Sequence, residues 1–151
     1  MIEIYYNNPI DFELIKGLYN DMDDLQSAWP GAKYPFCVEE WVSFLKTSDQ
    51  YASLIFKTND TIIGHLVLKP KRQEQLFVCF VVLDKKFRSK GIIYEMLKLT
   101  EHFALTHFIH DKLWLHVDPE NLPAVHAYEK MGYVFLETTE AGRLRMNKKI
   151  K

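Results

Sequence analysis

Apolar residues along this chain switch repeatedly between the alternating period of a strand and the longer period of a helix. Strand-like segments are predicted at residues 2–6, 51–57, 61–68, 113–117, 133–138 and 144–150. The longest apolar run, Leu76 to Leu83, has the composition of a central strand that is covered on both faces. Helical spacing follows Ile10, resumes at residues 39–45, and returns after Gly91 and after Asn121.

The order of these elements predicts the fold class. It runs strand, two helices, three strands, helix, strand, helix and two strands, with Asn59-Asp60 as a hairpin turn and residues 29–35 as a loop. A strand-helix-strand succession in the second half predicts at least one parallel strand pair with a right-handed crossover. We therefore expect an α/β protein with a mixed sheet. At 151 residues the simplest organisation is one domain that spans residues 1–151.

The composition argues against several classes of partner and location. Hydrophobic residues make up 48% and charged residues 26% of the chain, and a formal net charge of −1 gives no reason to expect nucleic acid as a partner. The longest apolar run is too short to cross a bilayer, and the N-terminal MIEIYYNNP carries Glu3 and lacks the apolar core of a signal peptide. Cys37 and Cys79 are too few for a disulfide framework. We therefore expect a cytoplasmic protein with no membrane partner.

A first candidate site lies where a buried strand is followed by a helix, at Arg88-Ser89-Lys90-Gly91-Ile92-Ile93. The N-terminus of a helix exposes backbone N–H groups and a partial positive charge, and Gly91 lets the backbone approach a phosphate closely. Lys85, Lys86, Arg88 and Lys90 add charge for further phosphate contacts. A solvated basic loop with a capping glycine explains the segment equally well. The glycines of a Walker P-loop or of a dinucleotide fingerprint are missing.

A second candidate site is the segment Leu115 to Tyr133, which reads LHVDPENLPAVHAYEKMGY. It combines a polar strand end, a helix-capping Asn121, a helical Tyr128 and a helix stop at Gly132. A strand, a turn and an amphipathic helix would give the same pattern in many α/β proteins. The order and spacing are nevertheless those needed to place one phenol beside a ligand held between two strands.

Together the two motifs resemble the GNAT superfamily of acetyl-CoA-dependent N-acetyltransferases. The family's pyrophosphate-binding motif, Gln/Arg-x-x-Gly-x-Gly/Ala after a strand, is matched by Arg88 to Ile93 behind Val81-Val82-Leu83. The second family motif is matched by Asn121, Ala124, Tyr128 and Gly132-Tyr133. Ile93 replaces the small final residue of the first motif, and Lys85 replaces the usual proline. The resemblance covers nearly the whole chain and implies a mostly antiparallel sheet, flanked by helices, with one parallel strand pair splayed at the CoA site.

The resemblance also implies how the chain would bind acetyl-CoA as its cosubstrate. Backbone groups of Val81, Val82 and Leu83 would pair with the pantetheine arm, and Asn121 would reach the CoA arm. The pyrophosphate would be held by six consecutive residues: Arg88, Ser89, Lys90, Gly91, Ile92 and Ile93. Tyr128 occupies the family position of the general acid. A phenol suits this role, because with a reference pKa of about 10 it is protonated at neutral pH. The alternative is a tyrosine that only packs on the sheet.

The implied activity is transfer of an acetyl group from acetyl-CoA to a primary amine. The acceptor would be a small-molecule amine or a peptide or protein N-terminus, attacking directly in a ternary complex. No metal is expected, neither cysteine is placed as a covalent nucleophile, and the family is compatible with a homodimer. A non-catalytic acyl-CoA-binding module of the same fold is the alternative, against which the retention of Tyr128 argues.

His116 is the candidate general base. Family members that acetylate ribosomal-protein N-termini carry a glutamate at the matching position of a similar LWLxV strand, and this chain has Leu113-Trp114-Leu115-His116-Val117. A histidine with a reference pKa of about 6.5 suits a base. The alternatives are an ordinary polar strand residue and a base acting through ordered water. Leu76 to Leu83 contains no glutamate or histidine, and Phe77 occupies the region where some relatives place the base.

The acceptor end is less defined by the sequence. Acidic side chains that would attract a cationic amine gather at Asp21, Asp23, Asp24, Glu39 and Glu40, although a solvated helix face is the favoured interpretation. Trp29, Tyr34 and Phe36 are pocket aromatics or core anchors. We expect His102, His107 and His110 to be solvated rather than metal ligands, and His65 to be structural.

Overall fold

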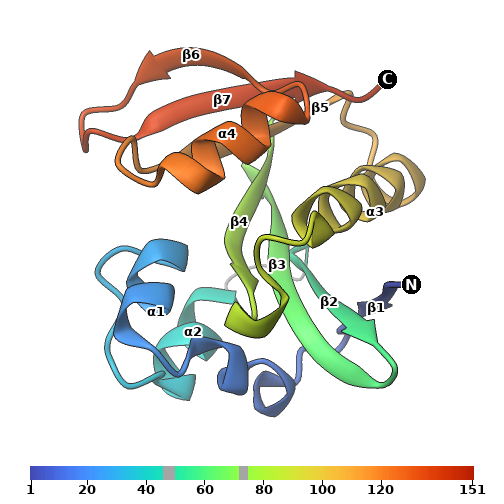
Figure 1. Cartoon of the computed structure of the whole chain (residues 1–151), viewed down its shortest axis with the longest axis vertical. Coiled ribbons are helices and arrows are strands. Elements are labelled where there is room, and N and C mark those ends of the chain that lie inside the picture. Colours follow the sequence, from blue (N-terminus) through green and yellow to red (C-terminus); the bar gives the residue numbers. More distant parts are fainter. Residues whose placement is uncertain (46–49, 72–74) are drawn as a thin grey trace.

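Four helices surround one seven-stranded sheet in the computed structural model, which describes residues 1–45, 50–71 and 75–151 (Figure 1). The strands are β1 (Glu3–Tyr6), β2 (Ala52–Thr58), β3 (Thr61–Lys71), β4 (Gln75–Leu83), β5 (Lys112–Val117), β6 (Val134–Thr138) and β7 (Leu144–Lys149). The helices are α1 (Met22–Ala28), α2 (Val38–Leu45), α3 (Ile92–His107) and α4 (Leu122–Lys130). Three short 3₁₀ turns are η1 (Phe12–Leu14), η2 (Lys16–Tyr19) and η3 (Lys85–Phe87).

The sheet is mixed, as the element order predicts. Its strand order is β1-β2-β3-β4-β5-β7-β6, and every neighbouring pair is antiparallel except β4 and β5, which are parallel. The predicted hairpin between β2 and β3 is confirmed. Its turn residues Asn59 and Asp60 have φ angles of 49° and 64°, which Asn and Asp tolerate better than other residues.

Two apolar clusters lie on opposite faces of the sheet. One packs α3 and α4 against β2–β5 through residues such as Met96, Leu97 and Leu115. The other packs α1, α2, η1 and η2 against β2–β4 through Leu25 and Trp41. Strand β4 supplies both clusters, which explains its continuous apolar sequence and confirms the prediction of a strand covered on both faces.

The helix predicted after Ile10 is wrong as one continuous element. The chain instead forms η1, η2 and then α1, because an aspartate restarts the backbone hydrogen bonding twice. The Asp11 carboxylate accepts a hydrogen bond from the Glu13 N–H, and the Asp21 carboxylate accepts from the N–H groups of Asp23 and Asp24. Apolar residues spaced by three or four satisfy a broken 3₁₀–α segment as well as one helix.

Candidate active site

The parallel strands β4 and β5 are paired for only two residues and then separate. Leu76 pairs with Leu113 and Phe77 with Trp114, and β4 continues to pair only with β3 while β5 continues only with β7. The edges of the two strands that face each other beyond Val78 and Leu115 are therefore left without a strand partner within the described residues. We call this opening the wedge. Its backbone N–H and C=O groups are free to pair with an extended ligand.

A β-bulge in β4 lies beside the wedge. Val67 of β3 pairs with Cys79 and His65 pairs with Val82, so two β4 residues, Phe80 and Val81, oppose one residue of β3. Phe80 has a φ of 55°, which is uncommon for a bulky residue. The bulge changes the direction in which the backbone groups of β4 point before the strand reaches Leu83. No local sequence pattern predicts the bulge, because a phenylalanine has no preference for this conformation.

Buried polar side chains hold the bulge from behind. The Tyr19 hydroxyl donates to the Phe80 carbonyl at 2.8 Å and lies 2.9 Å from His65 Nδ1. His65 Nε2 lies 2.8 Å from the Ser53 hydroxyl, which accepts a hydrogen bond from Asn7 Nδ2 at 3.2 Å. One arrangement of protons satisfies the whole chain: Ser53 donates to Nε2, and the Nδ1 proton of His65 is donated to Tyr19. The prediction that His65 is structural is confirmed, since its side chain is fully buried and both ring nitrogens are paired.

The turn before α3 has the backbone shape of an anion site. Ser89 and Gly91 have φ angles of 63° and 77°, and Gly91 is the N-cap of α3 without a side-chain capping bond. Alternating left-handed residues at a helix start direct successive N–H groups into one concavity. A Cβ on Gly91 would meet no heavy atom closer than 4.0 Å, so the glycine is required by its φ rather than by neighbouring protein.

Two basic side chains of this segment pair with aspartates at the start of α1. Arg88 Nε donates to the Leu83 carbonyl at 2.8 Å, and its guanidinium pairs with Asp24 of α1 at 2.9 Å. Lys85 pairs with Asp21 at 2.5 Å, a bond that lowers the pKa of Asp21 and raises that of Lys85. Arg88 and Lys85 therefore tie the start of α1 to the turn. The same pairs agree with the favoured interpretation of Asp21 and Asp24 as residues of an ordinary helix start.

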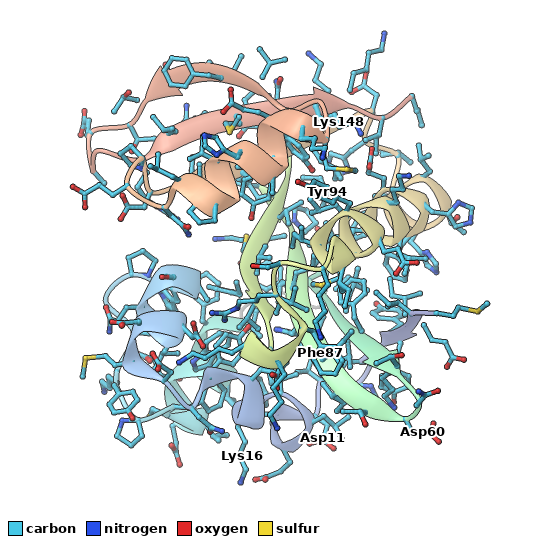
Figure 2. All side chains as sticks on the ribbon, viewed as in Figure 1. Asp11, Lys16, Asp60, Phe87, Tyr94 and Lys148 are labelled. Carbon is cyan, nitrogen blue, oxygen red and sulfur yellow. The ribbon has the colours of Figure 1, made fainter. Side chains whose placement is uncertain are left out.

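Helix α4 closes the far side of the wedge. Asn121 is its N-cap and accepts a hydrogen bond from the Ala124 N–H at 3.4 Å, so its amide NH₂ remains a donor. Lys130 of α4 lies 5.1 Å from the ring of Tyr94 on α3, and Figure 2 shows Tyr94 on the side of α3 that faces α4. The first turn of α3 and the last turn of α4 thus lie close together.

Tyr128 is buried, with 7% of its side chain exposed, and contacts the edge of the Tyr133 ring. Burial raises the pKa of Tyr128 to about 12. The charge of Arg143 opposes the shift, and Cys79 on β4 is the second group that acts on Tyr128 electrostatically. Tyr128 of α4 therefore lies near the β4 edge of the wedge. Its hydroxyl makes no hydrogen bond within the described part of the chain. The phenol is protonated at neutral pH and available as a donor.

His116 lies on the β5 side of the wedge and faces opposite to the buried Leu115 and Val117, as strand alternation predicts. Its Nε2 is 3.2 Å from Arg145 Nε. A guanidinium nitrogen can only donate, so the ring accepts at Nε2 and, when neutral, carries its proton on Nδ1. Burial first, and then the charges of Arg145, Arg143, Lys71 and Lys69, lower the pKa of His116 to about 4. The side chain is neutral at pH 7.

Among the described residues, no group of three or more histidines, cysteines, aspartates or glutamates is arranged to hold a metal ion. His107 is bonded to the carbonyl of Phe103 through Nδ1 and stacks on its ring at 3.8 Å. No helix in the described ranges combines the length and apolar character needed to cross a membrane.

Comparison with known proteins agrees with this geometry. The family model described as "Acetyltransferase (GNAT) family" matches residues 16–133. A spermidine N-acetyltransferase from Vibrio cholerae, solved with CoA and spermine, is 18% identical with a TM-score of 0.80, over 98% of this chain and 95% of that one. A GNAT family acetyltransferase from Elizabethkingia anophelis with acetyl-CoA bound is 20% identical with a TM-score of 0.70, over 98% and 97%. The ribosomal-protein-S18-alanine N-acetyltransferase from Escherichia coli is 16% identical with a TM-score of 0.75, over 100% and 95%. No curated protein sequence matches the chain.

The mixed sheet, which opens at the parallel strand pair of the described residues, has the fold of these acetyltransferases. The chain belongs to the acetyltransferase (GNAT) family, because the family model spans 118 of its 151 residues, counting 16 to 133 inclusive. It is an acetyltransferase, and the family resemblance of the two sequence motifs is confirmed.

Proposed function

We propose that the protein transfers an acetyl group from acetyl-CoA to a primary amine by direct attack in a ternary complex. The observation that carries the proposal is the wedge. The free β4 edge leads from Cys79, beside Tyr128, to Leu83 and then into the turn at Ser89 and Gly91. An extended thioester with a pyrophosphate at its far end has the length and polarity of that path.

The residues along the wedge fit each part of acetyl-CoA. The left-handed turn at Ser89–Gly91 and the first N–H groups of α3 (Ile92, Ile93) suit the pyrophosphate, with Lys90 as a nearby cation. Backbone groups of Val81, Val82 and Leu83 suit the amides of the pantetheine arm. The free NH₂ group of Asn121 suits a further arm carbonyl. Acetyl-CoA supplies a thioester carbonyl that an amine can attack.

Tyr128 is proposed as the general acid. Its raised pKa of about 12 means that it keeps its proton until a stronger base, such as a departing thiolate, forms beside it. A backbone N–H of β4 at the bulge suits the thioester oxygen, since a preorganised donor there costs no reorganisation during the reaction.

His116 is proposed as the base, in its neutral form. To accept a proton at Nε2 it must exchange its bond from Arg145 for one from the amine or from a bridging water. An ordered water that hands the proton to solvent is the alternative route. The low pKa of about 4 predicts that the base stays competent well below pH 6.5.

Direct transfer is favoured over a covalent acetyl-enzyme. Cys79 is the cysteine nearest Tyr128, and burial raises its pKa to about 12, so it stays a thiol at neutral pH and is a poor nucleophile. Cys37 precedes α2 and lies away from the wedge.

The test is a thiol-release assay with acetyl-CoA across small amines, amino acids, polyamines and N-terminal peptides. Acceptor-dependent release is expected. Tight CoA binding by calorimetry without release for any acceptor would contradict catalysis and favour the acyl-CoA-binding module. For the base, a pH–rate profile of His116→Ala is decisive: loss of the acidic limb supports His116, and an unchanged limb means that the proton leaves through water.

A further inference from the structure

Four cations gather on one face of the sheet beside the wedge: Lys69 and Lys71 of β3, Arg143 just before β7, and Arg145 of β7. We call this group the cationic face. It belongs to the side of the sheet that α1 and α2 occupy. Lys69 pairs with Phe77, and the pair two positions along, Val67 and Cys79, points to the same face and packs in the α1–α2 cluster. Within the described residues, that cluster includes nothing from β5, β6 or β7, so the helices leave this part of the face uncovered.

A continuous row of contacts crosses four strands on this face. Lys71 Nζ lies 5.5 Å from the centre of the Phe77 ring, and the Phe77 ring lies 5.0 Å from the His116 ring. His116 Nε2 is in turn 3.2 Å from Arg145 Nε. Trp114 extends the row beside Phe77, at 6.1 Å between ring centres. The proposed base His116 therefore lies between Lys71 on one side and Arg145 on the other, and its ring contacts that of Phe77.

Arg143 connects the row to the proposed acid. Its Nη2 donates to the His116 carbonyl at 3.2 Å, and its charge acts on Tyr128 and Cys79. Arg143 Nε is buried and has no hydrogen-bond partner within the described residues. A guanidinium offers five donors, and the one side-chain bond seen here leaves most of this fork unused.

Carboxylates offset only part of this charge. Glu137 pairs with Arg145, and Asp118 is the carboxylate that acts on Arg143. Lys69 lies over the rings of Phe44 and Tyr51, at 4.6 and 5.8 Å, and Lys71 over that of Phe77. Among the described residues, four cations against two carboxylates leave this face with a net positive charge. At the start of α1, two of the three aspartates that would attract a cationic amine are already paired, Asp21 with Lys85 and Asp24 with Arg88.

We infer that the acceptor is a small primary amine that carries an anionic group, a carboxylate or a phosphate, which the cationic face binds through Arg143 while the amine is directed to His116. The inference rests on the proposed acetyl transfer. It excludes polyamines as the preferred acceptors, in contrast to the acceptor named for the Vibrio cholerae enzyme. A cationic acceptor would place like charges beside four fixed cations.

The test compares acceptors of matched length and different charge. For the carboxylate arm these are 4-aminobutyrate, n-butylamine and 1,4-diaminobutane. For the phosphate arm they are 2-aminoethyl phosphate and ethanolamine. We expect kcat/KM to be about 10- to 100-fold higher for the anionic member of at least one arm, the effect of one or two charge-assisted hydrogen bonds. Equal or higher kcat/KM for the neutral or cationic members would overturn the inference.

A variant then assigns the effect to the cationic face. Arg143→Met is expected to lower kcat/KM for the anionic acceptor about tenfold more than kcat/KM for the neutral acceptor, because both acceptors share any effect of the lost bond to the His116 carbonyl. Lys57→Met is the matched control, because Lys57 lies on β2 over the Tyr5 ring and outside this face. An equal loss for both acceptors in Arg143→Met would overturn the inference. Thiol release with neutral or cationic acceptors alone would contradict the inferred anionic group of the acceptor but not the proposed acetyl transfer. No thiol release with any amine would contradict both the inference and the proposed transfer.

Discussion

Two tyrosine–histidine sets flank β4, and they differ in how their polar atoms are used. In the core, the Tyr19 hydroxyl is bonded to both His65 and the Phe80 carbonyl, and His65 has partners on both ring nitrogens. At the wedge, the Tyr128 hydroxyl has no partner within the described residues, and His116 accepts one bond from Arg145. Burial raises the pKa of both tyrosines and lowers that of both histidines.

A shifted pKa alone therefore does not identify a catalytic group. Full hydrogen bonding makes Tyr19 and His65 a structural support of the β4 bulge, since nothing is left to offer a ligand. Tyr128 is as strongly protonated as a structural tyrosine but keeps its donor free beside an open strand edge. Unused hydrogen-bonding capacity, not burial, separates the two sets.

Removing the hydroxyl of Tyr128 should have the largest effect on turnover. Tyr128→Phe is expected to lower kcat by about 10²–10⁴-fold, the usual contribution of a general acid, with little change in CoA affinity or thermal stability. Steady-state thiol release, calorimetry with CoA and a thermal melt measure the three quantities. Turnover within threefold of the wild type would remove Tyr128 from the acid role.

Local spacing explains why the sequence predicts the wedge set and not the core set. Gly91, Asn121 and Tyr128 each sit at a fixed distance from a helix end, and helix ends are encoded by adjacent residues. Most strands and three of the four helices follow from apolar periodicity for the same reason. The segment after Ile10 is the exception, because its breaks depend on aspartate side chains that cap within two or three residues.

The rest of the site depends on contacts between residues far apart in the chain. Tyr19 and Phe80 are 61 residues apart, and only their hydrogen bond explains a positive φ in a strand phenylalanine. Arg145 reaches His116 because the antiparallel register of β5 and β7 pairs these two positions. A one-residue change of register would turn Arg145 to the other face, so the cationic face cannot be read from composition.

The pH dependence of stability tests the core set. The pKa of His65 is lowered to about 3 in the folded state against about 6.5 when unfolded, so the unfolded state binds more protons between these values. Stability is therefore complete above pH 6.5 and is lost as pH falls. We expect the free energy of unfolding to be about 3 kcal/mol lower at pH 4.5 than at pH 7 from this group. Urea unfolding at several pH values measures it.

A non-titrating variant assigns that loss to His65. His65→Gln should be less stable at pH 7 and should show a flatter dependence on pH, whereas His102→Gln, an exposed histidine of α3, should keep the wild-type slope. An unchanged slope in His65→Gln would mean that other groups cause the acid loss.

Tyr19→Phe removes the corresponding hydroxyl in the core set. It removes the donor to the Phe80 carbonyl and the partner of His65 Nδ1, both buried, which should cost about 1–3 kcal/mol of unfolding free energy. Turnover per folded molecule should fall less than in Tyr128→Phe, because the bulge loosens while the acid remains. If Tyr19→Phe lost activity without losing stability, the distinction between the two sets would fail.

His116 should make the smallest difference to stability, although its pKa is also lowered. Its side chain is partly exposed to solvent, which screens charge, and Arg145 can move away when the ring is protonated. His116→Gln is therefore expected to change the loss of stability between pH 7 and pH 4.5 by less than about 1 kcal/mol. The same urea titrations measure it beside His65→Gln. A change as large as that of His65→Gln would mean that His116 has a structural role like that of His65. It would then contradict both the role of His116 as a base and the distinction between the two tyrosine–histidine sets.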